Sequence, residues 1–406
     1  CVGVGECRST EGGVMCPSYR ATGAEEHSTR GRSRLLFEML DGGRRGGPIA
    51  DGWRSEAVLD SLDLCLACKG CRSDCPVDVD MATYKAEFLA HHYRHRLRPR
   101  THYSMGWLPV AAALASRAPR LVNAATSVPA LAAVAKRVGG IHPERTIPEF
   151  ATETFTAWMA ERTPQGDGRL GEVLVWPDTF TNRFHPDVGR AVVEVIERAG
   201  WRAVVPERSV CCGLTWISTG QLATAQRVLG RTVRTLAPHL RRGGLVLGLE
   251  PSCTAVFRSD ARELLERSED VERLRQQTVT LAELLRDRTP GWEPPSVPGG
   301  AIVQPHCHHH AIMRFEGDHE LLDEVFEGDV DVLEGCCGLA GNFGFEDGHH
   351  DVSMACAEHA LLPALRDADD GTALLADGFS CRTQATQAMP GTRPRHLAQI
   401  LADAQR

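Results

Sequence analysis

The pattern of apolar and polar positions predicts six buried strands in the second half of the chain. They form two groups of three, and the segments between them carry apolar residues every three or four positions, as amphipathic helices do. The strands are expected at 172–177, 201–205 and 245–249, then at 301–305, 330–333 and 373–376. Strands that alternate with helices predict parallel sheets covered by helices.

Cysteines stand at matching places in the two groups. The distance from Pro177 to Cys211, the first cysteine of a Cys-Cys-Gly motif, is 34 residues, and the distance from Pro305 to Cys336 is 31. The second cysteine of each motif precedes the last cysteine of its group by 41 and 44 residues. We interpret this as an internal duplication. The strand ends of a parallel sheet share one edge, so the cysteines of each copy can converge there.

The first part of the chain is different in character. Residues 1–100 hold seven cysteines, whereas residues 101–165 hold none and are rich in alanine and interrupted by proline. Turn-rich segments at 162–171 and 288–300 mark boundaries. The expected fold class is α+β: a helical first domain followed by a duplicated α/β cysteine-rich domain with parallel sheets. The expected divisions are 1–100 (first domain), 101–165 (helical connector), 166–290 (lobe 1) and 296–406 (lobe 2).

Length and charge narrow the class of protein. A chain of 406 residues is longer than one hydrophobic core usually covers. The net charge of −8 argues against a nucleic-acid-binding surface.

No apolar run reaches the ~18 residues of a membrane span. The most apolar stretch, 107–136, is broken by arginines and prolines and predicts buried or interfacial helices. Because the chain starts on Cys1 rather than on methionine, we expect it to be part of a longer polypeptide.

Fifteen cysteines, an odd number and often adjacent, suit metal or cluster binding in a reducing compartment better than disulfides. The strongest motif is C-x2-C-x2-C-x3-C-P, formed by Cys65, Cys68, Cys71 and Cys75 with Pro76. It is the bacterial ferredoxin motif for a [4Fe–4S] cluster, in which the fourth cysteine belongs to a neighbouring cluster. A structural zinc site is the alternative, but its cysteine pairs are normally separated by a longer loop.

The opening residues, CVGVGEC, look like an altered second motif. Cys1 and Cys7 occupy its first and third positions, Val4 replaces the middle cysteine, and the Cys-Pro step is displaced to Cys16-Pro17. We therefore predict that residues 1–100 form a helical, bacterial-ferredoxin-like domain with a [4Fe–4S] cluster held by Cys16, Cys65, Cys68 and Cys71. Cys1, Cys7 and Cys75 would form a degenerate second site, which could hold a [3Fe–4S] cluster, a [4Fe–4S] cluster with His27 as an extra ligand, or nothing.

The duplicated copies offer unequal ligand sets. In the second copy, four cysteines could converge on zinc or an iron–sulfur cluster with His308 beside them: Cys307, Cys336, Cys337 and Cys381. In the first copy Thr179 replaces the first cysteine, which leaves Cys211, Cys212 and Cys253, and buried free thiols are the preferred interpretation. Cys356 lies on a helical pattern and is expected in the core.

Several segments resemble a known family. GGVMCPSYRATGAEEHSTRGRSRLLFEML (12–40) and LDLCLACKGCRSDCPVDVDMATYKAEFL (62–89) are similar to the iron–sulfur half of FAD-linked D-2-hydroxyacid dehydrogenases. The iron–sulfur subunit of glycolate oxidase and its counterpart in anaerobic glycerol-3-phosphate dehydrogenase look similar as well. The duplicated segments resemble the cysteine-rich domain of heterodisulfide reductase. That enzyme ends each copy in C-x-x-C, whereas this chain has Glu250 and Gly378 at the first of those positions.

The resemblance implies a function in electron transfer. Single electrons would pass from FAD, held in a flavin domain fused upstream or on a separate chain, through a [4Fe–4S] cluster to a quinone pool or a carrier protein. The substrate would be D-lactate, D-2-hydroxyglutarate or glycolate. The implied location is the cytoplasm, with peripheral membrane association left open. The alternatives are a heterodisulfide-reductase-like thiol/disulfide enzyme and a zinc-stabilised scaffold. The basic stretch 91–100 predicts a solvated helix end, or else a docking patch for the flavin domain.

Overall fold

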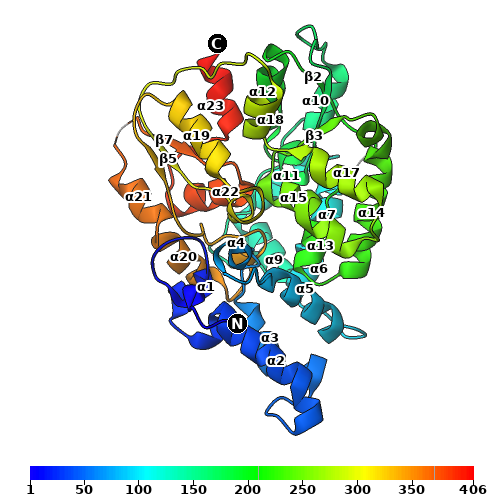
Figure 1. Cartoon of the computed structure of the whole chain (residues 1–406), viewed down its shortest axis with the longest axis vertical. Coiled ribbons are helices and arrows are strands. Elements are labelled where there is room, and N and C mark those ends of the chain that lie inside the picture. The colour runs from blue at the N-terminus through cyan, green and yellow to red at the C-terminus, as the bar shows by residue number, and fades with distance from the viewer. Residues whose placement is uncertain (209, 370) are drawn as a thin grey trace.

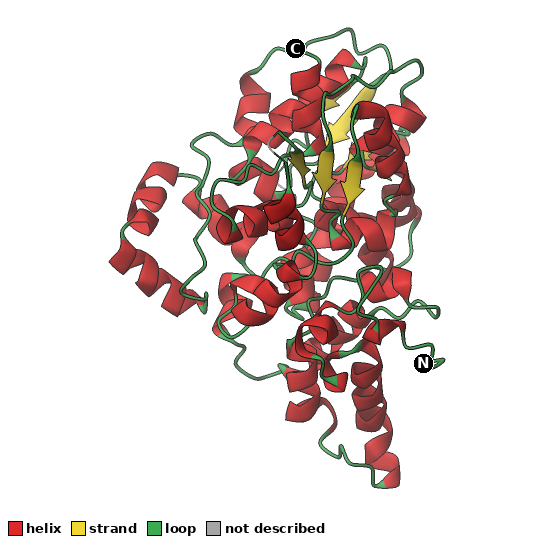
Figure 2. Cartoon of the chain, turned by 90° about the vertical axis from the view of Figure 1, so that its left-hand side faces the viewer, coloured by secondary structure: helices red, strands yellow, loops and turns green. Residues whose placement is uncertain are grey.

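The computed structural model describes residues 1–208, 210–369 and 371–406. Two small parallel sheets occupy its upper half, and helices make up most of the rest (Figures 1 and 2). The first helices, drawn in blue, extend below the body in Figure 1, while lobe 1 (green) and lobe 2 (yellow to red) lie side by side above them. The predicted parallel sheets are confirmed, although their strands are shorter than expected.

The N-terminal part and the connector are helical throughout. The N-terminal helices are α1 (Pro17–Thr22), α2 (Thr29–Arg45), α3 (Glu56–Asp63), α4 (Gly70–Asp74) and α5 (Met81–His92). The connector helices are α6 (Arg100–Ser104), α7 (Leu108–Ala115), α8 (Pro119–Ser127), α9 (Pro129–Gly139) and α10 (Phe155–Glu161). Proline stands at the first or second position of α7, α8 and α9, where its missing N–H costs no helical hydrogen bond.

Lobe 1 is built on a four-stranded sheet. Its strands are β1 (Glu172–Val175), β2 (Arg202–Val204), β3 (Leu245–Leu247) and β4 (Thr278–Val279), in the order β2-β1-β3-β4. Its helices are α11 (Thr179–Arg183), α12 (Pro186–Arg198), α13 (Leu214–Ser218), α14 (Leu222–Arg241), α15 (Pro251–Ala255), α16 (Ala261–Leu264), α17 (Glu269–Gln277) and α18 (Leu281–Arg288). In register, Val173 lies opposite Ala203 on one side and Leu245 on the other.

Lobe 2 repeats the arrangement with three strands. They are β5 (Ala301–Val303), β6 (Val330–Val332) and β7 (Ala373–Leu375), in the order β6-β5-β7. Its helices are α19 (Glu316–Val325), α20 (His350–Glu358), α21 (Leu361–Asp367), α22 (Phe379–Ala388) and α23 (Leu397–Ala404). In both sheets the first strand lies between the second and the third, as an internal duplication requires.

Short helical turns complete the chain. The 3-10 turns are η1 (Glu6–Arg8), η2 (Glu25–His27), η3 (Gly52–Arg54) and η6 (Phe343–Phe345), and the π-helical turns are η4 (Val256–Asp260) and η5 (His309–Met313). The two π turns contact each other, and η5 also packs on α4, the helix that carries Cys71. Single π turns are frequent at functional sites.

One hydrophobic core runs through both lobes. It joins the inner strands β1 and β5 to helices of both copies, and α23 of lobe 2 packs on α12 of lobe 1. Phe155, from the connector, is fully buried in the same core. The lobes therefore pack as one body around shared apolar side chains. The stretch 107–136, in contrast, was expected to form buried or interfacial helices, and burial is wrong: most of its large apolar side chains are exposed.

Two helical glycines provide a matched test of this packing. A Cβ on Gly189, in α12, would lie 2.6 Å from Cδ2 of the buried Phe155 ring, whereas a Cβ on Gly230, in α14, would meet only ordinary contacts at 3.5 Å or more. We expect Gly189→Ala to lower the free energy of unfolding by about 1–3 kcal/mol through overpacking. Gly230→Ala should leave it unchanged or raise it by up to about 1 kcal/mol through helix propensity. Urea denaturation measures both, and equal effects would contradict the described packing.

Candidate functional site

The four cysteines predicted to hold a cluster surround one small pocket. Cys16 stands at the N-cap of α1, Cys65 follows α3, Cys68 lies in the loop, and Cys71 is in α4, and all four line the same space. The remaining walls are formed by side chains such as Met15, Arg32 and Met81. Two segments separated by about fifty residues in sequence are thus brought together as the motif spacing predicts.

Backbone conformation turns the Cys65–Cys71 loop around the pocket. Ala67 and Lys69 have φ of 53° and 60°, in the left-handed region that side chains other than glycine seldom adopt. Lys69 is held there by its own side chain, because its ammonium lies 2.7 Å from Asp80 and 3.0 Å from Asp260. Burial lowers the pKa of Lys69, but the two carboxylates outweigh that effect and the pKa is raised. Lys69 therefore remains charged and clamps the loop to lobe 1.

Asp74 brings Cys16 to this loop. Its Oδ2 accepts hydrogen bonds from the backbone N–H groups of Val14 (2.7 Å) and Met15 (2.9 Å), directly before Cys16. Its Oδ1 lies 3.0 Å from Nε2 of His310 in lobe 2. The segment can approach so closely because Gly13 has no side chain: a Cβ there would lie 2.6 Å from the Asp74 carboxylate. The pattern alone did not reveal this role for Asp74.

Arg32 supplies a buried positive charge to the pocket. Its guanidinium donates to Cys16 Sγ at 3.4 Å, to Ser18 Oγ at 2.8 Å and to the Ser61 carbonyl at 2.8 Å. Burial raises the pKa of the Cys16 thiol, yet Arg32 and Ser18 outweigh it and the pKa is lowered. Arg32 thus favours a thiolate at Cys16. No specific sequence signal points to this arginine, which lies in an Arg-rich helix start.

The other thiols fit a site whose charge is completed by a metal cluster. Burial raises the pKa of Cys68, and the thiols of Cys307 and Cys71 raise it further. Burial likewise raises the pKa of Cys71, although the Met81 N–H donates to its sulfur at 3.4 Å. Four buried thiolates are costly without a compensating positive charge, which iron in a [4Fe–4S] cluster provides. The residues present therefore fit that group.

The degenerate second set is less compact. Cys1 is exposed at the chain start, while Cys7 is buried in the hydrophobic cluster that also contains Cys16, with Cys75 packed against it. Burial raises the pKa of Cys7, against hydrogen bonds from the Arg30 backbone and Ser28. His27 bonds to Thr22 Oγ1 at 2.9 Å through Nδ1. Cys7 and His27 therefore already have hydrogen-bond partners.

The cysteines of lobe 2 form a chain of contacting sulfurs beside the first group. Cys307 Sγ lies 3.2 Å from Cys336 Sγ, and the thiol of Cys337 interacts with those of Cys336 and Cys381. Cys381 lies in the first turn of α22, not at the strand end as expected. Because Cys307 is also an electrostatic neighbour of Cys68, this sulfur group adjoins the predicted cluster site.

His308 links the two sulfur groups. Its Nε2 lies 3.0 Å from the carbonyl of Ala67 in the cluster loop, while its Nδ1 is buried without a hydrogen-bond partner. It lines a cavity with a volume of about 250 Å³. The cavity walls include Cys65, Cys68, Cys337 and Cys381, and most of the lining is apolar. The volume lies just below the ~300–1,000 Å³ typical of small-molecule sites.

Lobe 1 places its sulfurs elsewhere. Cys212 Sγ and Cys253 Sγ lie 3.0 Å apart in a hydrophobic cluster of lobe 1, with Cys211 packed against it. Cys253 lies in α15, again in a helix and not at a strand end. Cys356 is buried, and its sulfur lies 3.5 Å from the Pro17 carbonyl, so the core position expected for it is observed next to the cluster site.

Glu250 and Gly378, which stand where the related C-x-x-C motifs have their first cysteine, lie close together between the lobes. Glu250 accepts a hydrogen bond from the N–H of Phe379, next to Gly378, at 2.8 Å, and another from Ser252 at 2.8 Å. A Cβ on Gly378 would lie 2.3 Å from the His306 ring, so a cysteine does not fit there without rearrangement. Burial, helped by Asp178, raises the pKa of Glu250 to about 7.

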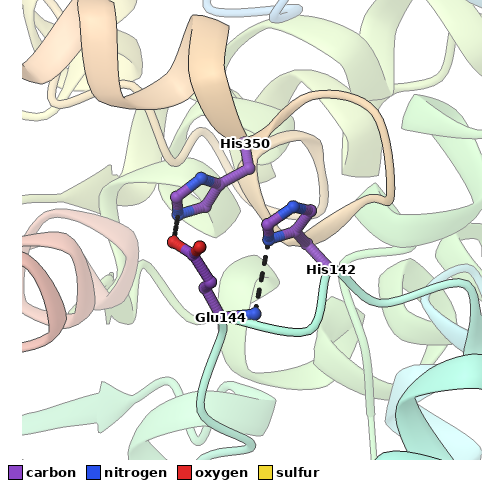
Figure 3. Close-up of side chains that lie close together, drawn as sticks. All are labelled: His142, Glu144 and His350. Atoms are coloured by element: carbon purple, nitrogen blue, oxygen red, sulfur yellow. Dashed lines mark hydrogen bonds and ion pairs between the residues drawn. The ribbon is translucent and has the colours of Figure 1, made fainter.

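Two groups of histidines and carboxylates also lie close together among the described residues, and neither contains a cysteine. In the first, His142 and His350 stack with ring centroids 4.3 Å apart, and His350 Nε2 lies 3.7 Å from Glu144 (Figure 3). Lone pairs of parallel rings do not converge, so this contact holds the connector against α20. The second is the buried pair His309–Asp318 (3.1 Å) with Asp377 nearby. Asp318 raises the pKa of His309 against the effect of burial.

Comparison with known proteins assigns the two cysteine-rich parts. The model of a 4Fe–4S dicluster domain matches residues 1–79, and the model of a cysteine-rich domain matches residues 178–258. The D-2-hydroxyglutarate dehydrogenase of Pseudomonas putida is 26% identical over 100% of this chain and 43% of its own length. The chain is homologous to the C-terminal part of the D-2-hydroxyglutarate dehydrogenases.

Further relatives match parts of the chain. One subunit of the anaerobic glycerol-3-phosphate dehydrogenase of Escherichia coli is 25% identical over 70% of this chain and 72% of its own length. Lactate utilization protein A of Bacillus pumilus is 30% identical over 42% of the chain and 74% of its own length. The chain spans less than half the length of the D-2-hydroxyglutarate dehydrogenases it matches. No solved structure matches the chain.

The carboxyl group of Glu250 predicts a pH dependence of stability in this dehydrogenase homologue. Its pKa rises from an ordinary value of 4.5 to about 7 on folding, so the folded state binds more protons between these values. The corresponding stability is present below pH 4.5 and is lost as the pH rises through 7. Glu250→Gln cannot ionise. Between pH 4.5 and 8, the free energy of unfolding of this variant should therefore rise by roughly 3 kcal/mol relative to that of wild type.

Denaturant unfolding at a series of pH values measures this difference. Glu293→Gln, at an exposed position, controls for the loss of one carboxylate. A constant difference between Glu250→Gln and wild type across the pH range would show that folding does not shift the pKa of Glu250.

Proposed function

We propose that this chain is the iron–sulfur electron-transfer portion of a flavin-dependent D-2-hydroxyacid dehydrogenase. The observation that carries the proposal is the pocket in which Cys16 joins Cys65, Cys68 and Cys71. The homology to the C-terminal part of the D-2-hydroxyglutarate dehydrogenases and to two further oxidoreductase-related proteins supports the same role. D-lactate, D-2-hydroxyglutarate and glycolate are the candidate substrates. The FAD domain belongs to the part of these relatives that the chain does not span.

The four cysteines would hold a [4Fe–4S] cluster, which when bound supplies the one-electron transfer needed to pass on a two-electron oxidation in single steps. The chain's own residues set the conditions for it. Arg32 places a positive charge on Cys16, the Met81 N–H donates to Cys71, and Lys69 fixes the loop. Hydrogen bonds and charges of this kind set the reduction potential of a cluster. The acceptor would be a quinone or a carrier protein.

A cluster suits the pocket better than a zinc ion does. In a zinc tetrathiolate each sulfur lies about 2.3 Å from the metal, so the sulfurs must lie within ~4 Å of one another. Among the described residues, the sets of donor atoms that are close enough for a single ion contain no cysteine. The four sulfurs are therefore spaced more widely than one zinc ion requires, which supports the cluster and disfavours the zinc scaffold.

A thiol/disulfide enzyme is the second candidate. The observation that favours it is the pair of short sulfur–sulfur distances, 3.0 Å for Cys212–Cys253 and 3.2 Å for Cys307–Cys336. Glu250 and Gly378 replace two of the cysteines that such an enzyme uses. We propose for lobe 2 that Cys307, Cys336, Cys337 and Cys381, with His308, form a second metal or cluster site. For Cys1, Cys7 and Cys75 we propose no stable cluster.

Metal analysis of anaerobically purified protein tests the main proposal. We expect about four irons and four acid-labile sulfides per chain from the predicted site, and about eight irons if lobe 2 is also loaded. Cys68→Ser should remove about four irons and the signal of the reduced cluster in electron paramagnetic resonance. Cys253→Ser, which changes a buried thiol of lobe 1, is the matched control and should retain both. A colourless preparation containing only zinc would overturn the proposal.

Arg32 offers a second test, of the electrostatics of the pocket. Arg32→Met removes the positive charge beside Cys16, so the oxidised cluster, which is less negative, should be favoured. We expect the reduction potential to fall by roughly tens of millivolts, while Arg32→Lys should restore most of the wild-type value. Redox titration followed by electron paramagnetic resonance measures this. Arg54→Met, at an exposed position, is the control, and an equal shift in that variant would show that the effect is not local.

A further inference from the structure

Helices α7, α8 and α9 expose an unusual amount of apolar surface. Leu114, Leu121, Val134 and Val138 are 58%, 72%, 61% and 68% exposed. Val110, Val128 and Leu131 are exposed on the same helices. Helices α8 and α9 pack side by side, and exposed apolar residues gathered on neighbouring helices mark sites of interaction. We call the exposed side of α7–α9 the connector surface.

The same part of the chain carries only positive charge. Between Phe88 and Pro143 there are eight arginines and lysines and not one aspartate or glutamate, although the chain as a whole has a net charge of −8. Arg117, Arg120 and Arg137 lie on or directly beside the connector helices and are exposed. Within the described part of the chain, none of the eight cations forms an ion pair with a carboxylate. The connector surface is therefore basic as well as apolar.

Polar contacts on the inner side fix these helices to the body. Asn123 bonds to both backbone groups of Phe150, at 2.8 and 2.9 Å, and Trp107 Nε1 donates to Gln221 at 3.0 Å. Ser104 donates to the Gly139 carbonyl at 2.7 Å. Figure 2 shows a helical arm projecting on the side away from the N-terminus, the side on which α7 and α9 lie behind the body in Figure 1. The outer face is thus presented rigidly and left uncovered.

We propose that the connector surface binds the surface of an anionic lipid bilayer. Helices with an apolar face flanked by lysine and arginine lie in the interfacial plane of such membranes, where both the buried apolar area and the attraction to anionic headgroups contribute. Positive charge without any carboxylate in the same stretch is complementary to anionic headgroups. Among the described residues no helix combines the length and apolar character required to cross a bilayer.

Helix α7 contributes to the apolar cavity. Leu108, the first residue of α7, and Met105, at the end of α6, line the cavity together with residues of the Cys65–Lys69 loop. Binding through the connector surface would therefore place a helix that lines this largely apolar cavity at the lipid headgroups. A lipid-soluble acceptor could reach the cavity from there. That consequence rests on the proposed function, whereas lipid binding itself does not.

Sedimentation with lipid vesicles tests the proposal on the anaerobically purified, iron-loaded chain. We expect binding to vesicles of phosphatidylcholine with phosphatidylglycerol to exceed binding to phosphatidylcholine alone by at least ~10-fold, and to weaken at 0.5 M salt, roughly as electrostatic attraction requires. Arg117→Glu with Arg120→Glu should reduce binding by at least ~10-fold. Leu121→Glu with Val134→Glu should do the same by removing apolar contact.

Matched controls use exposed residues elsewhere. Arg227→Glu with Arg231→Glu changes two exposed arginines of α14, and Phe37→Glu with Leu40→Glu changes two exposed apolar residues of α2. Both should bind vesicles like wild type. The iron content and the thermal midpoint of every variant should match wild type, which separates a failure of lipid binding from a failure of the proposed function.

Two results would overturn the proposal. One is the absence of vesicle binding by the wild-type chain, or binding that is equal for neutral and anionic vesicles and insensitive to the connector variants. The other is binding of the flavin-containing dehydrogenase half that the same variants abolish, without any affinity for vesicles. In that case the connector surface is a protein interface.

Discussion

The structure depends on the buried ion pairs of Lys69. The loop that carries Cys65, Cys68 and Cys71 must follow a left-handed backbone path, and Lys69 stabilises that path by reaching Asp80 from the N-terminal part and Asp260 from lobe 1. Breaking a buried pair by removing one partner typically costs about 3–5 kcal/mol, because the remaining charge is left unpaired. The geometry of the predicted cluster site is therefore coupled to the docking of lobe 1 through the Lys69–Asp260 pair.

The two lobes contribute unequally to the site although they share one topology. Lobe 2 places its sulfurs and His308 against the cluster loop, whereas the sulfurs of lobe 1 pack in its own hydrophobic cluster. At the position where the related pattern has a cysteine, lobe 1 has Glu250, which binds the backbone at the start of α22 in lobe 2. The two lobes thus have the same topology but different contacts. In lobe 1 the cysteine position is occupied by a residue that joins the lobes, whereas in lobe 2 the thiols lie near the predicted cluster site.

Much of the site could be predicted from local patterns, but its supporting contacts could not. The spacing of Cys65, Cys68 and Cys71 and the displaced Cys16-Pro17 predicted which thiols meet, because a cluster requires ligands at those intervals. The roles of Arg32 and Asp74 could not be predicted, because they depend on contacts between residues distant in sequence. Arg32 contacts Cys16, 16 residues away, and Asp74 contacts Val14, about 60 residues away. The parallel sheets followed from the alternation of strands and helices, whereas their strand order was not predicted. For 107–136 the sequence left two interpretations open, since an alanine-rich helix has the same pattern whether it is buried or interfacial.

The distribution of charge also bears on orientation. Because residues 88–143 hold eight cations and no carboxylate, the rest of the chain carries a net charge of −16. A negatively charged surface would attract the connector helices and repel the remainder, so the molecule would approach it in one preferred orientation even before any apolar contact forms. The polar contacts that fix α7–α9 to the body make this orientation rigid. Leu108, in α7, lines the same cavity as the cluster loop, so the orientation that electrostatics favours would turn one of the helices that line this cavity toward the charged surface.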